Sequence, residues 1–163
     1  MCNTANPEVD EEVTPETPIP TKVGDIDFIK KHEGLRLTAY MPTKNDVWTI
    51  GYGHTKTAKR GMKITESDAE SLLRGDLAWV RAALAQHVKV PLSQPQYDAL
   101  ASFIYNLGTP NFAKSTLLRK LNASDYVGAA NELPRWNKQK GKVLRGLTKR
   151  RAEEKAMFLK GTL

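Results

Sequence analysis

Residues 32–55, HEGLRLTAYMPTKNDVWTIGYGHT, contain the signals that decide the fold. The stretch begins at the end of an amphipathic segment, residues 26–33, whose apolar residues have helical spacing, and Gly34 is a typical helix stop. A turn-rich segment at 42–46 then separates two runs of strand-forming residues, and closely spaced glycines follow. The pattern predicts a short helix, a small antiparallel hairpin and a glycine-bent strand.

The rest of the chain follows helical periodicity. Thr65 with Asp68, and Ser93 with Gln96, have the spacing of capping boxes that begin helices. After Thr65 apolar residues recur every three or four positions, which predicts a helix of about 20 residues. Further helices are predicted over 93–107, 115–121, 125–133 and 147–159, and a loop over 138–145. The predicted fold class is α+β, with a small N-terminal lobe carrying a short antiparallel sheet, one long connecting helix and a helical C-terminal lobe.

The first 24 residues differ in composition from the remainder. They contain four prolines, five acidic residues and one base, and no aromatic residue. Because this composition buries too little apolar surface to offset the entropy of ordering, we expect 1–24 to be a disordered acidic tail or linker and 25–163 to form one domain. The chain carries a net charge of +7 and the tail −4, so the domain carries +11. Such a domain is attracted to polyanions: nucleic acid, anionic lipid or an acidic wall polymer.

Several function classes are disfavoured. The one cysteine, Cys2, allows neither an intrachain disulfide nor a CxxC metal site. We expect no metal and no cofactor. No apolar run approaches the roughly 18 residues of a membrane span, and the N-terminus lacks the basic and apolar regions of a signal peptide. We therefore expect synthesis in the cytoplasm and no stable membrane insertion.

Glu33 is the first candidate for chemistry. Acid catalysis on a sugar requires a partly buried carboxylic acid held protonated near neutral pH, and Glu33 lies between a helix and the hairpin, where packing can hold its backbone beside a cleft. Asp46 and Thr49, on the hairpin, are candidates for positioning water or stabilising charge at the anomeric carbon. The residue types alone leave other roles open: Asp46 as a turn former, Thr49 as a strand residue and His54 as a structural hydrogen-bonding group.

Residues 32–40 followed in order by 48–55 strongly resemble the phage lysozyme family, glycoside hydrolase family 24, which includes the T-even phage lysozyme. The C-terminal half is also similar to this family, in residues 97–108, 111–118, 135–136 and 146–154. The resemblance covers about residues 25–160. It implies a lysozyme-like fold and an endolysin that hydrolyses the β-1,4 bond between N-acetylmuramic acid and N-acetylglucosamine of peptidoglycan, usually with inversion, and so lyses the host cell.

The resemblance also implies site residues. The family places a Glu, an Asp and a Thr around a cleft between the lobes, and Glu33 and Thr49 match two of them. The family's aspartate stands nine residues after the glutamate, where this chain has Pro42. Asp46 is the only carboxylate in the turn, and we expect it to replace the missing aspartate. The substrate contacts implied by the family are Leu35, His54, Tyr105, Ser115 and Asn131.

The remaining expectations concern partners and surfaces. The resemblance implies a phage or prophage origin, and we expect a monomer that acts on peptidoglycan after release through a holin-type pore. We expect Trp79 and Trp136 to be core residues, and the basic run at 149–151 to be solvated. Two other functions stay open: a wall-binding module that lost its chemistry, suggested by Pro42, and a nucleic-acid binder, suggested only by charge. Because no recognisable reading element accompanies the charge, we expect no nucleic-acid partner.

Overall fold

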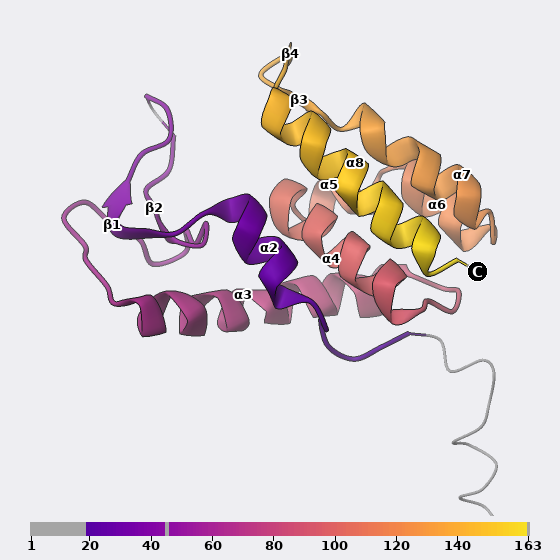
Figure 1. Cartoon of the computed structure of the whole chain (residues 1–163), viewed down its shortest axis with the longest axis horizontal. Coiled ribbons are helices and arrows are strands. Elements are labelled where there is room, and N and C mark those ends of the chain that lie inside the picture. Colours follow the sequence, from indigo (N-terminus) through magenta and orange to yellow (C-terminus); the bar gives the residue numbers. More distant parts are fainter. Residues whose placement is uncertain (1–18, 45, 163) are drawn as a thin grey trace, which may run out of the picture.

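The computed structural model describes residues 19–44 and 46–162. Within them the chain forms α2 (Ile26–Glu33), β1 (Arg36–Tyr40), β2 (Thr49–Gly51), α3 (Glu66–His87), α4 (Gln94–Leu107), α5 (Thr109–Ala113), α6 (Thr116–Asn122), α7 (Tyr126–Glu132), the 3₁₀ turn η1 (Leu133–Arg135), β3 (Lys138–Gln139), β4 (Lys142–Val143) and α8 (Arg145–Lys160). The β1–β2 hairpin lies at one end of the molecule and the C-terminal helices at the other (Figure 1). Helix α3 runs along one side of the molecule, from the β1–β2 hairpin to the C-terminal helices (Figure 1). The predicted α+β class with a long connecting helix is confirmed.

The N-terminal lobe follows the local signals in the sequence. Asp25 caps α2 by accepting a hydrogen bond from the backbone N–H of Phe28. The helix ends at Gly34, whose positive φ of 74° is a conformation that side chains other than glycine rarely adopt. Strands β1 and β2 then pair antiparallel, as predicted, with Tyr40 opposite Thr49. Glu33 is thereby held at the junction of helix and sheet.

The two long helices begin where the capping boxes predict. The Thr65 hydroxyl accepts from the backbone N–H of Asp68 while the Asp68 carboxylate accepts from the N–H of Thr65, and Ser93 and Gln96 make the same pair of bonds. Each box satisfies backbone donors that a helix start otherwise leaves unpaired. Both predicted helix starts are confirmed.

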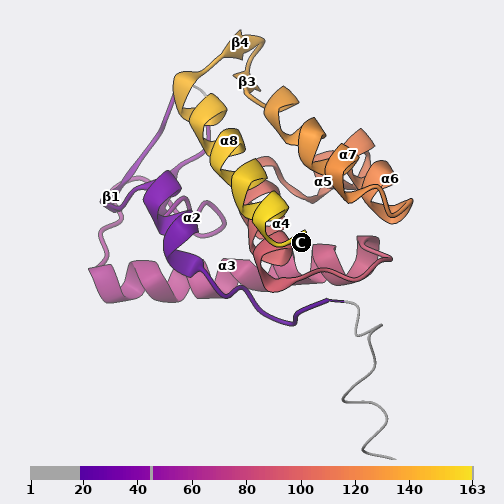
Figure 2. The same cartoon turned by 45° about the vertical axis from the view of Figure 1, so that its right-hand side comes forward.

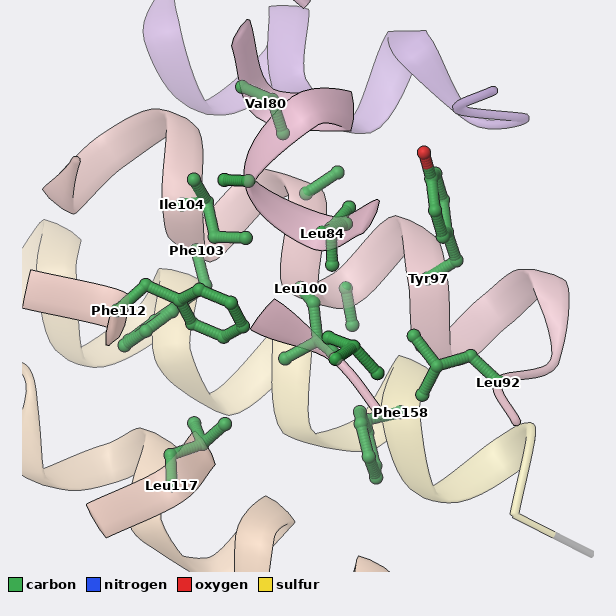
Figure 3. Packing of buried hydrophobic residues seen from close by; sticks show 14 of the residues in the cluster. Val80, Leu84, Leu92, Tyr97, Leu100, Phe103, Ile104, Phe112, Leu117 and Phe158 are labelled. Atoms are coloured by element: carbon green, nitrogen blue, oxygen red, sulfur yellow. The ribbon is translucent and has the colours of Figure 1, made fainter. Parts of the chain in front are cut away.

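Helix α4 is the centre of the hydrophobic core. Leu100, Phe103 and Ile104 are fully buried between α3 and α8, and they pack with Leu84 of α3 and Phe158 of α8 (Figure 3). A helix buried on so many sides is fixed by dense packing, which tolerates little displacement. It therefore offers a rigid support for any side chain that it directs into a cleft.

Residues 19–24 differ from the predicted tail, because they are attached to the domain. The backbone N–H groups of Gly24 and Asp25 donate to the carboxylate of Asp98 on α4, at 2.8 and 2.9 Å, and Ile19 and Val23 pack against the core. The domain thus begins before the predicted boundary at residue 25. The rest of the predicted tail, 1–18, lies outside the described residues.

A second difference is the predicted loop at 138–145, part of which forms an antiparallel hairpin. Lys138 pairs with Val143 and Gln139 with Lys142, around a turn in which Lys140 and Gly141 have positive φ. Figure 2 shows this β3–β4 hairpin projecting beyond the first turn of α8. None of the helices in the described part of the chain combines the length and apolarity that crossing a membrane requires.

Candidate active site

A cleft of about 530 Å³ is formed by side chains of both lobes. Its lining residues are Glu33, Tyr40, Pro42, Thr49, Gly53, Thr55, Lys56, Asp76, Trp79, Tyr105, Asn106 and Gln139. Three of the predicted site residues, Glu33, Thr49 and Tyr105, are thus brought together. They come from the end of α2, the start of β2 and the last turn of α4.

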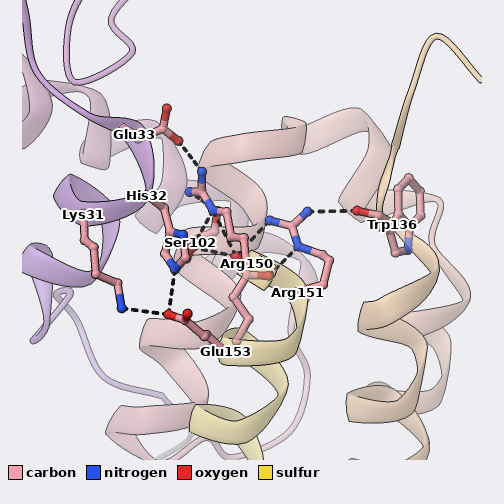
Figure 4. Close-up of polar contacts among 9 residues, drawn as sticks. Lys31, His32, Glu33, Ser102, Trp136, Arg150, Arg151 and Glu153 are labelled. Carbon is pink, nitrogen blue, oxygen red and sulfur yellow. Dashed lines mark hydrogen bonds and ion pairs between the residues drawn. The ribbon is translucent and has the colours of Figure 1, made fainter. Parts of the chain in front are cut away.

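Glu33 is held from two sides. Its side chain is 16% exposed, and Oε2 accepts a hydrogen bond of 2.6 Å from Nη1 of Arg150 on α8 (Figure 4). On the other side lies Gly53, with a φ of 90°, where an added Cβ would stand 2.7 Å from Glu33 Oε1. The carboxyl group therefore lies between a buried guanidinium group and a bend that only glycine fits.

Arg150 is itself fixed by α4. Its Nε donates to the hydroxyl of Ser102 at 3.2 Å, and its Nη2 donates to the backbone carbonyl of Ser102 at 3.1 Å. The Arg150 side chain is only 4% exposed. A guanidinium group held at several donors in this way presents the remaining N–H to Glu33 in a set direction.

Thr49 and Tyr105 line the cleft from two different elements, β2 and α4. The buried hydroxyl of Thr49 donates to the carbonyl of Val47 at 3.2 Å, which leaves its oxygen lone pairs as acceptors. The Tyr105 hydroxyl donates to the carbonyl of Tyr52 at 2.7 Å, and burial raises the pKa of Tyr105 well above its ordinary value. The Tyr105 ring stacks on Trp79 with 6.0 Å between centroids. The aromatic pair supplies a flat apolar wall of the kind that packs against a sugar ring.

His54 supports the site from behind and does not line the cleft. Its Nε2 accepts from the backbone N–H of Thr57 at 3.2 Å, so the ring proton belongs on Nδ1, which lies 2.7 Å from Oδ2 of Asp76. Asp76 does line the cleft. His54 thereby links the glycine bend to α3. This is the structural hydrogen-bonding role that the sequence analysis gave as one possibility for His54.

Asp46 does not reach the cleft. Its carboxylate accepts hydrogen bonds from the backbone N–H of Val47 at 2.8 Å and from the Thr43 hydroxyl at 2.9 Å, and these bonds lower its pKa. Pro42 lines the cleft instead. Asp46 has the geometry of a turn former, since the longer turn directs its carboxylate back to the local backbone.

The mouth of the cleft is spanned by one contact between the lobes. Nζ of Lys140, at the tip of the β3–β4 hairpin, donates to Oγ1 of Thr43 at 3.3 Å. These residues are 97 positions apart in the chain. Gln139 beside Lys140 and Pro42 beside Thr43 both line the cleft, so the contact lies at its edge.

The structure does not place the other predicted substrate contacts with Glu33. Ser115 is buried and caps α6, donating to the carbonyl of Phe112 and accepting from the N–H of Leu118. Leu35 packs against the core, and Asn131 is exposed on α7. None of Leu35, Ser115 and Asn131 lines the cleft described above.

Arg150 and Trp79 belong to the site although the sequence patterns did not indicate them as site residues. The run at 149–151 was expected to be solvated, but Arg150 and Arg151 are buried, because Glu154, three and four positions later, faces both on one side of α8. Opposite charges at this spacing were the available signal. Trp79 packs against the core as expected and also lines the cleft. Within the residues described, no group of three or more histidine, cysteine or acidic side chains is arranged to hold a metal ion.

The family model described as phage lysozyme matches residues 30–154. The chain belongs to the phage lysozyme family. It is 51% identical over 135 residues to an endolysin of Acyrthosiphon pisum secondary endosymbiont phage 1, covering 80% of this chain and 92% of that protein. It is 44% identical over 136 residues to the endolysin of Salmonella phage P22, with coverage of 80% and 92%. It is also 45% identical over 139 residues to the endolysin of Bacillus phage B103. That match covers 83% of this chain but only 52% of the B103 protein, so the chain spans about half of that relative's length.

Solved structures agree with this assignment. The muramidase domain of SpmX from Asticaccaulis excentricus is 39% identical, with a TM-score of 0.80 and coverage of 86% of this chain and 99% of that one. A mutant of P22 lysozyme is 40% identical, with a TM-score of 0.74 and the same coverage. The two-lobed arrangement of this phage lysozyme is thus shared with both.

Proposed function

We propose that this protein is an endolysin that hydrolyses the β-1,4 bond between N-acetylmuramic acid and N-acetylglucosamine in peptidoglycan. The observation that carries the proposal is the position of Glu33: a largely buried carboxyl group in an interlobe cleft, oriented from both sides. Endolysins 44 and 51% identical to this chain, and a muramidase domain with the same fold, support it.

In this mechanism Glu33 is the general acid. It donates its proton to the glycosidic oxygen as the bond to the anomeric carbon breaks, so that the departing sugar leaves as an alcohol. The arrangement suits this step because Oε2 is occupied by Arg150, whereas Oε1 faces the glycine bend at the cleft wall. The proton is therefore delivered from a carboxyl group of fixed orientation.

Thr49 is proposed to orient the attacking water. Because its own proton is donated to the Val47 carbonyl, its oxygen accepts a hydrogen bond from water and leaves a water lone pair directed away from it. As this water attacks the anomeric carbon it loses a proton to solvent, and solvent returns a proton to Glu33. Tyr105 and Trp79 are proposed to hold a sugar ring by stacking. Neither Asp46 nor Pro42 has a part in proton transfer here.

Glu33→Gln tests this proposal. Glutamine keeps an acceptor for Arg150 but has no acidic proton, so we expect release of new reducing ends from purified peptidoglycan to fall by roughly 10²–10⁴-fold, with a nearly unchanged melting temperature. The matched control is Glu66→Gln, an exposed acid at the start of α3, which should keep wild-type activity. Wild-type rates in the Glu33→Gln protein would remove Glu33 from the mechanism.

A second candidate is a wall-binding protein without chemistry, because Pro42 lies in the cleft where the family pattern implies a carboxylate. It predicts that the wild-type protein sediments with peptidoglycan and releases no reducing ends. Release of reducing ends from peptidoglycan by the wild-type protein would exclude this second candidate and support the hydrolase.

We further propose that the protein acts as a monomer and reaches the wall from the host cytoplasm through a holin-type pore. The monomer is supported by a cleft whose walls all come from one chain. Sedimentation equilibrium tests the oligomeric state, and lysis of host cells with and without a co-expressed holin tests the route. Lysis without the holin would refute that route.

A further inference from the structure

Behind Glu33 lies a second, more deeply buried carboxylate, that of Glu154 on α8, which has 0% side-chain exposure. Its Oε2 accepts from the Ser102 hydroxyl at 2.6 Å and from Nη2 of Arg151 at 2.9 Å, and lies 3.4 Å from Nε of Arg150. Its Oε1 lies 2.7 Å from Nε of Arg151. Glu154 therefore contacts both of the buried guanidinium groups, one of which binds Glu33.

These four side chains form a charge cluster of two carboxylates and two guanidinium groups. A guanidinium beside a carboxyl group favours its anionic form, and the effect is larger where water is excluded. A general acid, however, must hold its proton until the substrate arrives. Without Glu154, two cationic groups would act on Glu33, and among the described residues no other buried anion contacts either of them.

We infer that Glu154 is a positioning residue for Glu33: it fixes Arg150 and balances the charge of the two arginines beside the catalytic carboxyl group. This inference rests on the proposed role of Glu33 as the acid. Through Ser102, Glu154 also locks the orientation of Arg150, because the same hydroxyl donates to Glu154 and accepts from Arg150.

Other charged and titratable groups surround Glu33. They are His32 beside it on α2, Tyr40 of β1, Lys56 of the following loop, Asp76 of α3 and Tyr105 of α4. None of them contacts Glu154 within the described residues. A substitution at Glu154 therefore affects Glu33 through the position of Arg150 and through the electrostatic potential of the charge cluster.

The test is the pH profile of kcat on purified peptidoglycan. In Glu154→Gln the cluster gains one net positive charge beside the catalytic carboxyl group, and the alkaline limb of the profile moves down by roughly one pH unit. At a fixed pH above the limb, kcat falls by about tenfold while KM stays within about twofold. The double variant Glu154→Gln with Arg151→Met removes one charge of each sign, and its limb returns to the wild-type position.

Glu132→Gln is the matched control. Glu132 is also buried and paired with two bases, Lys120 and Arg135, but it lies on α7 and contacts no residue of the cluster. Its alkaline limb stays at the wild-type pH. If Glu154→Gln gives no folded protein, Arg151→Met replaces it, with the limb expected at higher pH.

Three results would overturn the inference: an unmoved limb in Glu154→Gln, a double variant that stays as displaced as the single one, or an unmoved limb in Arg151→Met. In each case the proposed function stands, because the wild-type protein is active. An inactive wild-type protein would instead refute the proposed function.

Discussion

At the scale of single residues, Gly53 shows how closely the active site depends on an absent side chain. In Gly53→Ala the new Cβ would overlap Oε1 of Glu33, at 2.7 Å, on a backbone whose φ of 90° already disfavours alanine. We expect the Glu33 carboxyl to move and kcat to fall on the order of 100-fold, as displacements of about 1 Å can cause. Gly61→Ala is the control, because Gly61 also has a positive φ, of 83°, but has no atom near its Cβ position. Equal activity of the two variants would contradict this view.

Asp46 gives the opposite prediction. Because its carboxylate is bound to the Thr43 hydroxyl and the Val47 backbone, and not to the cleft, Asp46→Asn should change kcat on peptidoglycan by no more than about twofold. A loss comparable with that of Glu33→Gln would return Asp46 to the mechanism and show that the turn rearranges when substrate binds.

The positions of some site residues could be predicted from the sequence and those of others could not, for physical reasons. Glu33 and Thr49 are fixed by adjacent secondary structure, so their neighbourhood is readable from the local pattern. Asp46 lies in a turn whose extra length decides where the carboxylate points, and no local rule sets that direction. Arg150 belongs to a basic run whose burial depends on Glu154 and on packing against α4, a tertiary effect that periodicity alone does not reveal.

At the scale of elements, the segment 19–24 is bound to α4 by Asp98 and by Gln94, whose amide donates to the Lys22 carbonyl at 3.0 Å. The Asp98 carboxylate accepts from Gly24, Asp25 and Gln94, and burial raises its pKa. Asp98→Ala should leave these donors without their acceptor and lower the free energy of unfolding by about 2 kcal/mol, measured by chemical denaturation. Asp27→Ala, on the exposed face of α2, is the control and should change it by less than about 0.5 kcal/mol.

Helices and their starts were predictable because capping boxes are local, whereas the attachment of 19–24 and the β3–β4 hairpin were not. Proline-rich composition argued for a free tail up to residue 24. The observed order comes from hydrogen bonds to Asp98, more than 70 positions away. The β3–β4 hairpin carries no strand signal in the sequence, because its strands are only two residues each, too short for an alternating pattern.

At the scale of the whole molecule, α2 of the first lobe is joined to α8 of the last by His32. The ring lies 3.0 Å from Glu153, 121 positions away, while burial and the nearby Arg150 lower the pKa of His32. The unfolded chain, with an ordinary pKa of about 6.5, therefore binds a proton more readily than the folded one. Stability is complete above that value and declines as the pH falls through it.

We therefore expect the free energy of unfolding to fall between about pH 7.5 and 5.5, and to fall less in His32→Gln. Denaturant titrations of both proteins across this range measure the difference. His87→Gln, at the end of α3, is the control and should retain the wild-type slope. Parallel curves for wild type and His32→Gln would contradict the assignment to His32.

The hydrogen bond from Lys140 to Thr43 joins the two lobes at the edge of the cleft, so that protein surrounds the cleft opening there. Cross-linked peptidoglycan has few free strand ends that could pass through this closed opening. A glycan strand must therefore enter the cleft from the side, while the hydrogen bond is broken. Both partners are solvent-exposed, and one such bond is weak enough for thermal motion to open it. We therefore expect activity on intact sacculi to depend on opening of this hydrogen bond more than activity on soluble glycan fragments, whose free ends can enter the cleft lengthwise.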